Sequence, residues 1–219
     1  MPTITTSDLE VVFPKSEKSK IDVEKLESGT DIIAVKSLSD LKTTVFATGV
    51  GAFTGQGVSE SNVVLESTKK NTDTPKFVLA NKNFSQSEIK IVGNGKGKIN
   101  INTGAFRNST IKGGKKNDSI RFGNESIVNN NSINLGKGGD SITFKPRTTF
   151  KGKTTINLVK GGKDVVKFGK NPNLQKGAKV VIKNFDKQDK LIVGKNTFNY
   201  NDIKRGSADI PGKIEIRLV

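Results

Sequence analysis

One short theme recurs along the second half of the chain at a nearly constant spacing. Each copy has a β-branched run, a glycine-rich turn with an aspartate, and a second run in which apolar residues alternate. The turn aspartates stand 22, 24 and 25 residues apart: Asp118, Asp140, Asp164 and Asp189. Apolar residues of the first run stand 22, 22, 23 and 24 residues apart: Ile89, Ile111, Ile133, Ile156 and Val180. Two rows that share one period are typical of a solenoid, in which each repeat is one coil that buries its apolar side against its neighbours.

Within each copy the apolar residues lie two apart, as Ile120 and Phe122 do, and as Ile133 and Leu135 do. This alternation is the period of a β-strand with one buried face. The sequence therefore predicts two strands per coil with an interior of isoleucine and phenylalanine. The phenylalanines of the second run fall on the inner face and are expected to be core residues, not a ligand platform: Phe122, Phe144 and Phe168.

These patterns predict an all-β protein built as a β-solenoid, similar to a β-roll or β-helix, with about five coils of 22–25 residues. We place the solenoid at residues 77–197, because pairs such as Phe77 with Leu79 and Ile99 with Ile101 extend the row of second strands toward the N-terminus. The two ends of a solenoid need caps. We assign residues 1–76 to an N-terminal β-rich cap or assembly region, and residues 198–219 to a C-terminal capping strand.

The N-terminal region gives weaker signals. Short β-branched runs predict strands at residues 4–12, 32–35, 43–46 and 61–66, and a short helical turn near residues 37–41. The glycine-rich segment 49–57 lacks the spacing of a nucleotide-binding loop and is interpreted as a flexible connection or contact loop.

Composition limits the chemistry. The chain has no cysteine and no histidine, which excludes disulfides, thiolate zinc sites and any catalysis that depends on histidine. No apolar run approaches 18 residues, so we expect no membrane insertion. The formal net charge is +16, but residues 1–80 carry 9 − 11 = −2 and residues 81–219 carry 28 − 10 = +18. The repeat region is therefore the basic part of the chain.

The turns of the repeat resemble those of a known family. Residues 113–121 are similar to the nonapeptide of RTX (repeats-in-toxin, haemolysin-type) proteins, Gly-Gly-x-Gly-x-Asp-x-apolar-x, and residues 136–142 match it from the second glycine onward. Residues 162–166 match less well, and residues 182–191 resemble the segment that often ends such a β-roll. The resemblance is degenerate and covers about residues 90–193. It implies calcium-binding β-roll repeats and secretion by a type I system without an N-terminal signal peptide.

The resemblance implies a metal site at four carboxylates: Asp118, Asp140, Asp164 and Asp189. The turns depart from the family in one respect that bears on this site. They contain lysines, whereas Ca²⁺ requires six to eight oxygen ligands: Lys115, Lys116, Lys137, Lys160 and Lys163. A lysine ammonium can supply the charge that the metal would bring, or the aspartates can accept hydrogen bonds from turn N–H groups. We therefore expect no cofactor, with Ca²⁺ as the alternative.

Basic residues at outward positions predict a positive surface, which we expect to repeat along the solenoid and to attract an extended anion. The residues assigned to it are Lys112, Arg121, Lys145, Arg147, Lys151, Lys153, Lys167 and Lys183. Acidic polysaccharide and acidic protein surfaces are the expected partners, together with other structural subunits. Nucleic acid is favoured less, because single strands are recognised by exposed aromatic residues and the only tyrosine is Tyr200. Lysines that merely solubilise a flat β-surface are the simpler alternative.

The function that these expectations favour is structural and not enzymatic, with no catalytic residues. We predict an attachment protein in a larger exterior assembly, such as a phage virion decoration, a spike or tail component, or a cell-surface layer. The expected location is extracellular or virion-associated, and from residues 1–8, which have neither a basic start nor an apolar run, we expect no N-terminal signal peptide. Two alternatives stay open: a Ca²⁺-binding RTX module of a type I secreted protein, and a β-solenoid enzyme that degrades polysaccharides.

Overall fold

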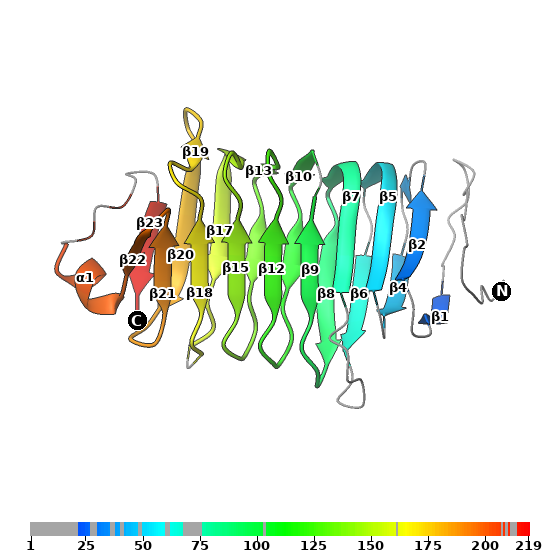
Figure 1. Ribbon diagram of the computed structural model, residues 1–219, viewed down its shortest axis with the longest axis horizontal. Coiled ribbons are helices and arrows are strands. Elements are labelled where there is room, and N and C mark those ends of the chain that lie inside the picture. The colour runs from blue at the N-terminus through cyan, green and yellow to red at the C-terminus, as the bar shows by residue number, and fades with distance from the viewer. Residues whose placement is uncertain are drawn as a thin grey trace.

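A computed structural model describes most of the 219-residue chain. It describes the backbone of strands within residues 22–67, and residues 76–219 except 103, 161, 207, 209 and 211–213; side chains are described from residue 83 onward. The fold is an elongated β-solenoid whose strands stack along one axis, with the C-terminus at one end (Figure 1). The predicted fold class is confirmed.

Two sheets run along the solenoid. The nine-stranded sheet contains, in order, β1 (Asp22–Leu26), β4 (Lys42–Ala47), β6 (Asn62–Ser67), β8 (Glu88–Gly93), β11 (Thr110–Lys112), β14 (Ser132–Asn134), β17 (Lys153–Asn157), β20 (Lys179–Phe185) and β23 (Ile214–Leu218). Its strands pair in parallel with their counterparts one coil away, as β11 does with β8 and β14. Five of them lie within residues 77–197, in agreement with the expected number of coils.

The fourteen-stranded sheet supplies the other two sides of each coil. One side contains β9 (Lys98–Ile101), β12 (Ser119–Phe122), β15 (Ser141–Phe144), β18 (Val165–Phe168) and β21 (Lys190–Val193). The other contains β10 (Ala105–Arg107), β13 (Ile127–Asn129), β16 (Thr149–Lys151) and β19 (Asn173–Leu174). The two sides meet at β7 (Lys76–Ser85), which pairs with both β9 and β10. We call the strands of the nine-stranded sheet the first row, the β9 side the second row and the β10 side the third row.

The third row is absent from the sequence-based prediction, which gave each coil two strands. Its strands are only two or three residues long, and each contributes one large inward side chain to the core. Phe106, Val128 and Phe150 stand in register on β10, β13 and β16, and their side chains are 0–1% exposed. The coil therefore has three sides, and the predicted two-strand coil is wrong.

The isoleucine row of the first sheet is confirmed except at its last member. Ile89, Ile111, Ile133 and Ile156 are register partners on neighbouring strands, and all four are fully buried. The next residue in this row is Ile182, which pairs with Ile156, whereas Val180 pairs with Thr154. The last coil is longer than the others, so an assignment by nearly constant spacing stopped two residues short.

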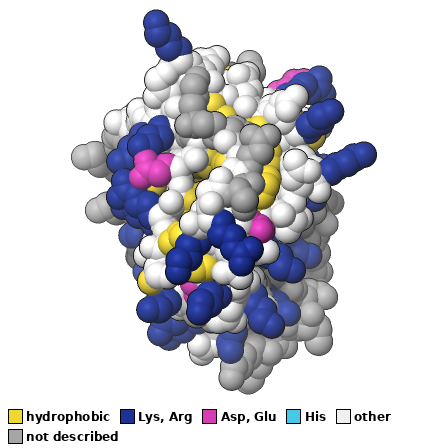
Figure 2. All heavy atoms as spheres, turned by 90° about the vertical axis from the view of Figure 1, so that its left-hand side faces the viewer, with side chains coloured by type: hydrophobic (Ala, Val, Ile, Leu, Met, Phe, Trp, Pro, Cys, Tyr) yellow, Lys and Arg dark blue, Asp and Glu magenta, His cyan; other side chains and the backbone are white. Residues whose placement is uncertain are grey.

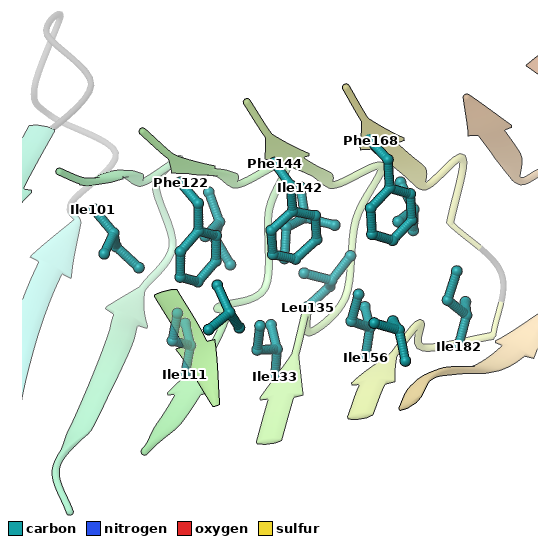
Figure 3. Close-up of a cluster of buried hydrophobic side chains, with 14 of the residues drawn as sticks. Ile101, Ile111, Phe122, Ile133, Leu135, Ile142, Phe144, Ile156, Phe168 and Ile182 are labelled. Carbon is teal, nitrogen blue, oxygen red and sulfur yellow. The ribbon is translucent and has the colours of Figure 1, made fainter. Parts of the chain in front are cut away.

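The phenylalanines of the second row fill the interior as expected (Figure 3). The rings of Phe122 and Phe144 stack with centroids 4.9 Å apart, and those of Phe144 and Phe168 stack at 5.1 Å. Parallel in-register pairing places each ring directly over its counterpart one coil away. These side chains are at most 1% exposed, so they are core residues and not a ligand platform.

A left-handed backbone residue stands at the corner between the third and first rows in successive coils. Gln86, Asn108 and Asn130 have φ of 49°, 47° and 52°, and Gly152 continues the row with φ of 56°. Asparagine and glycine tolerate this conformation better than most residues. Repetition of the corner keeps the coils in register.

The described strands before residue 76 pair into the same two sheets. β2 (Thr30–Val35) and β3 (Leu38–Ser39) both pair with β5 (Val50–Ser59), which pairs with β7, and β6 pairs with β8. The strands expected at 32–35, 43–46 and 61–66 are confirmed, whereas the one expected at 4–12 lies outside the described residues. The role of residues 1–76 as a cap or assembly region stays a prediction.

Two further N-terminal predictions are wrong. The glycine-rich segment 49–57 is a flexible loop in the prediction, but most of it belongs to β5, where parallel partners on both sides outweigh the low strand propensity of glycine. The helical turn expected near residues 37–41 is wrong where it is described, because residues 38–39 form β3.

The C-terminal end of the solenoid differs from its body. β22 (Asn196–Phe198) pairs antiparallel with β21 and ends the second row. The single described helix, α1 (Tyr200–Lys204), begins with a capping box between Asn199 and Asp202. β23 then returns to the first row and pairs with β20, where the capping strand was predicted. In the described part of the chain no helix is both long and apolar enough to cross a membrane.

Candidate functional site

The turns that connect the first row to the second are the widest in each coil and contain the predicted aspartates. They span residues 94–97, 113–118, 135–140, 158–164 and 186–189, and they form the lower row of loops in Figure 1. We call them the wide turns. Successive wide turns lie one coil apart, and the aspartate that ends each of the last four recurs along the axis of the solenoid.

The four aspartates form a ladder through the main chain. The N–H of Asp118 donates to Oδ1 of Asp140 at 2.6 Å, and the N–H of Asp140 donates to Oδ1 of Asp164 at 2.8 Å. The N–H of Asp164 donates to Oδ1 of Asp189 at 3.0 Å. At the other end of the ladder, the N–H of Gly97 donates to Oδ1 of Asp118 at 2.7 Å. Each carboxylate therefore ties its coil to the preceding one.

The second carboxylate oxygen distinguishes the inner aspartates from the outer ones. Oδ2 of Asp118 accepts the N–H of Gly114 at 2.6 Å, and Oδ2 of Asp189 accepts the N–H of Asp186 at 2.7 Å. Oδ2 of Asp140 and Oδ2 of Asp164 are buried without a hydrogen-bond partner. The middle of the ladder is therefore buried and underpartnered.

Burial changes the protonation of these carboxyls. Desolvation raises the pKa of Asp140 from its ordinary value of 3.8 to about 8, against a lowering by the N–H of Asp118 and with a further raising by the charges of Asp164 and Asp118. Desolvation likewise raises the pKa values of Asp118 and Asp164 to about 6, and it raises the pKa of Asp189. A neutral carboxyl in the middle of the ladder follows at neutral pH.

These features bear on calcium binding, which the family resemblance implies. A calcium ion takes six to eight oxygens, several of them from ionised carboxylates. In the described residues no three acidic side chains gather around one point, and each Oδ1 of the ladder already accepts an N–H. The Oδ1 atoms of the ladder are thus already engaged, whereas the two unpartnered Oδ2 atoms leave acceptor capacity there.

The lysines of the wide turns face solvent, whereas the ladder aspartates face the interior. The five lysines in the three middle turns are exposed, whereas the aspartates beside them are at most 3% exposed. We call these five residues the lysine edge: Lys115, Lys116, Lys137, Lys160 and Lys163. Exposed Lys96 and Lys187 continue the row on either side. In this part of the chain no ion pair joins the lysine edge to the ladder aspartates, so the expected alternative of aspartates that bond turn N–H groups is the one observed.

The basic residues predicted from the sequence do not share one surface. Lys112, Lys153 and Lys183 lie on the first row, Arg121 and Lys167 on the second, Lys145 and Arg147 in the turns after the second, and Lys151 on the third. Lys112 pairs with Glu88 at 2.5 Å and Arg147 pairs with Glu125 at 3.1 Å, so part of this charge is neutralised locally.

Strand positions do not repeat a basic residue in every coil. The register row of Arg121 reads, from β9 to β21, Asn100, Arg121, Thr143, Lys167 and Ile192. Among the described residues from 96 to 187, the wide turns alone place a lysine in every coil. The turn lysines are evident in the sequence, but the prediction assigned the basic surface mainly to outward strand residues.

The second row adds basic residues next to the wide turns. Lys98 and Lys190 begin β9 and β21, and both are exposed. None of the five described strands of this row contains an acidic residue. Figure 2, which looks onto the C-terminal end, shows Lys and Arg side chains around much of the rim and few acidic ones.

In comparisons with known proteins, no family model, no curated protein and no solved structure matches the chain. The fold is thus established by the structure alone, and the resemblance to RTX repeats rests on the turn residues.

Proposed function

We propose that this chain is a non-enzymatic attachment protein that holds an acidic partner through the basic outer surface of a rigid β-solenoid. Its setting would be a larger exterior assembly, such as a virion decoration, a spike or tail component, or a cell-surface layer. The observation that supports the proposal is the separation of charge at the wide turns. Every ladder aspartate is buried, and the lysines between them face outward.

The rigid core supports a structural role. Three rows of in-register strands and a continuous file of stacked phenylalanines resist bending along the axis. A stiff body keeps its outward side chains at fixed spacings, which reduces the entropy lost when an extended partner binds. Attachment needs such a scaffold, whereas it needs no reactive group.

The polysaccharide-degrading alternative has less support. Hydrolysis of a glycosidic bond requires two carboxylates that reach the substrate. Among the described residues, the regularly spaced carboxylates are those of the ladder, and they are at most 3% exposed and occupied by main-chain N–H groups.

A calcium-binding module is the second candidate, and one observation favours it. The unpartnered Oδ2 atoms of Asp140 and Asp164 lie in adjacent coils of the ladder. Burial of a polar atom without a partner is costly, and a bound cation could supply that partner. Calcium titration, described in the Discussion, separates this candidate from the first.

Binding to immobilised polyanions tests the attachment proposal. The purified chain should be retained on heparin and dextran sulfate but not on uncharged dextran, and retention should fall steeply between low and high salt. An equally basic protein with its charge spread over a globular surface serves as the reference for non-specific ion exchange. Absence of retention at physiological ionic strength, or retention that ignores salt, would contradict the proposal.

A further inference from the structure

The geometry points to the lysine edge as the binding site, and to a linear sulfated or carboxylated polysaccharide that lies along the solenoid axis as its ligand. This inference rests on the proposed attachment function and specifies its surface and partner. Lys115, Lys137 and Lys163 occupy three successive wide turns, and Lys116 and Lys160 lie beside them. Lys96 and Lys187 extend the row by one coil at either end.

The site is elongated along the axis and regular. Neighbouring strands of a sheet lie ~4.8 Å apart, so the four steps from Lys96 to Lys187 cover about 19 Å. A band of cations with at least one lysine in every coil suits a polymer whose anionic groups also recur at intervals. A globular protein partner would present its acidic residues at irregular positions instead.

The turns hold the row in place. The N–H of Gly113 donates to the carbonyl oxygen of Asn134 at 2.7 Å, and the N–H of Lys137 donates to that of Gly114 at 3.0 Å. The N–H of Gly139 donates to Oδ1 of Asn117 at 3.0 Å. These bonds cross from one coil to the next, so the Cα atoms of the lysines are fixed and only the side chains adjust.

The ladder aspartates do not offset the charge of the lysine edge at its surface; in the last wide turn, half-buried Asp186 lies beside Lys187. The neighbouring acidic side chains of the ladder point into the coil, where Asp118, Asp140 and Asp164 are at most 3% exposed. Ion pairs such as those of Lys112 and Lys179 involve glutamates of the first row. A row of exposed ammonium groups backed by a low-dielectric wall concentrates the field that attracts a polyanion.

The aromatic residues favour polysaccharide over nucleic acid. Single-stranded nucleic acid is held by bases that stack on exposed aromatic rings. From residue 83 to residue 197, where side chains are described, every phenylalanine is buried: Phe84, Phe106, Phe122, Phe144, Phe150, Phe168 and Phe185. The lysine edge therefore has no stacking platform, and ionic contacts to sulfate or carboxylate groups are what it offers.

Two charge-matched triple variants test the inference. The first is Lys115→Gln, Lys137→Gln and Lys163→Gln, which removes three lysines of the lysine edge. The control removes three exposed lysines outside the wide turns, Lys170→Gln, Lys176→Gln and Lys195→Gln. Both lower the formal net charge equally, from +16 to 16 − 3 = +13. Affinity is measured for heparin oligosaccharides of increasing length and for oligo-dT of similar charge, with thermal unfolding to verify the fold.

The lysine edge variant should bind heparin oligosaccharides roughly tenfold more weakly or worse, while the control changes less than threefold. Affinity should rise with oligosaccharide length until the row is covered. Equal losses in the two variants would overturn the inference while leaving attachment by diffuse charge intact. Tighter binding of oligo-dT than of heparin would overturn the choice of ligand. Failure of the wild-type chain to bind any polyanion would instead remove the proposed function itself.

Discussion

The main-chain N–H of Asp118 donates to Oδ1 of Asp140, a residue one coil further along the solenoid, over 2.6 Å. The other oxygen of the same carboxyl group is buried without a partner. The Oδ1 atom of Asp140 thus stabilises the stacking of two coils, whereas the burial of Oδ2 makes the charged form of the carboxyl unfavourable.

Stability should therefore depend on pH with a definite sign. The pKa of Asp140 is about 8 in the folded chain and 3.8 ordinarily, so between these values the folded state binds a proton that the unfolded state releases. Stability is lost as pH rises through this window, and the loss is complete above about pH 8. The raised pKa values of Asp118 and Asp164, about 6, act in the same direction between pH 3.8 and 6.

Asp140→Asn should reduce this dependence, because asparagine keeps the Oδ1 acceptor and cannot ionise. Its melting temperature relative to wild type should improve from pH 5 to about pH 8 and level off above that. Thermal unfolding at constant ionic strength measures the effect, and Asp202→Asn in the exposed capping box serves as a control. Parallel pH profiles for wild type and Asp140→Asn would show that this carboxyl ionises freely in the folded chain.

The file of phenylalanines predicts a contrast within one strand. Phe144→Ala removes a ring that stacks on both Phe122 and Phe168, and it should destabilise the fold by about 3–5 kcal/mol, as truncation of buried aromatic residues typically does. Thr143→Ala, on the outer face of the same strand, should change stability by no more than about 0.5 kcal/mol. Chemical denaturation measures both. A mild effect of Phe144→Ala would mean that the interior is loosely packed.

The stacked turns predict a similar contrast between two glycines. Gly136 has φ of +86°, and a Cβ there would lie 2.3 Å from the carbonyl oxygen of Gly114 in the preceding coil. Gly136→Ala therefore forces two coils apart and should cost more than the roughly 1–2 kcal/mol of a left-handed alanine alone. Gly177 has φ of +78° but nothing within 4 Å of such a Cβ, so Gly177→Ala isolates the conformational part. Equal costs for the two variants would contradict the close stacking of the wide turns.

Calcium should have little effect on the folded chain. The Oδ1 atoms of the ladder are occupied by main-chain N–H groups, so we expect the same circular dichroism spectrum and melting temperature after chelation and after addition of millimolar Ca²⁺. A melting temperature that rises with Ca²⁺ but not with Mg²⁺, and no longer does so in Asp140→Asn, would instead establish the calcium module.

Much of the fold could be predicted because the repeated residues are large apolar side chains, which a stable fold must bury. Ile111, Ile133 and Ile156 recur at the period of the coil, and the structure pairs them side by side. The third row escaped notice because its strands are too short for alternation to show. The spacing of Phe106, Val128 and Phe150, 22 residues at each step, carried the same signal as the isoleucines.

The candidate site was only partly predictable for a different reason. Sequence spacing places aspartates and lysines in the same turns, but it does not say which of the two faces inward. That choice depends on N–H groups of the adjacent coil, such as that of Asp118 facing Asp140, and these exist only after the coils have stacked. Outward strand residues such as Lys112 were overvalued because their pairing with Glu88 on the neighbouring strand is likewise a product of stacking.

Ile111 pairs in register with Ile133, and Ile120 with Ile142, at the same separation in sequence. Residues 110–131 therefore form one complete coil that could be duplicated. A tandem copy of this segment would meet the same partners above and below that the original meets. The molecule could thus be lengthened one coil at a time, while its two ends stay unchanged.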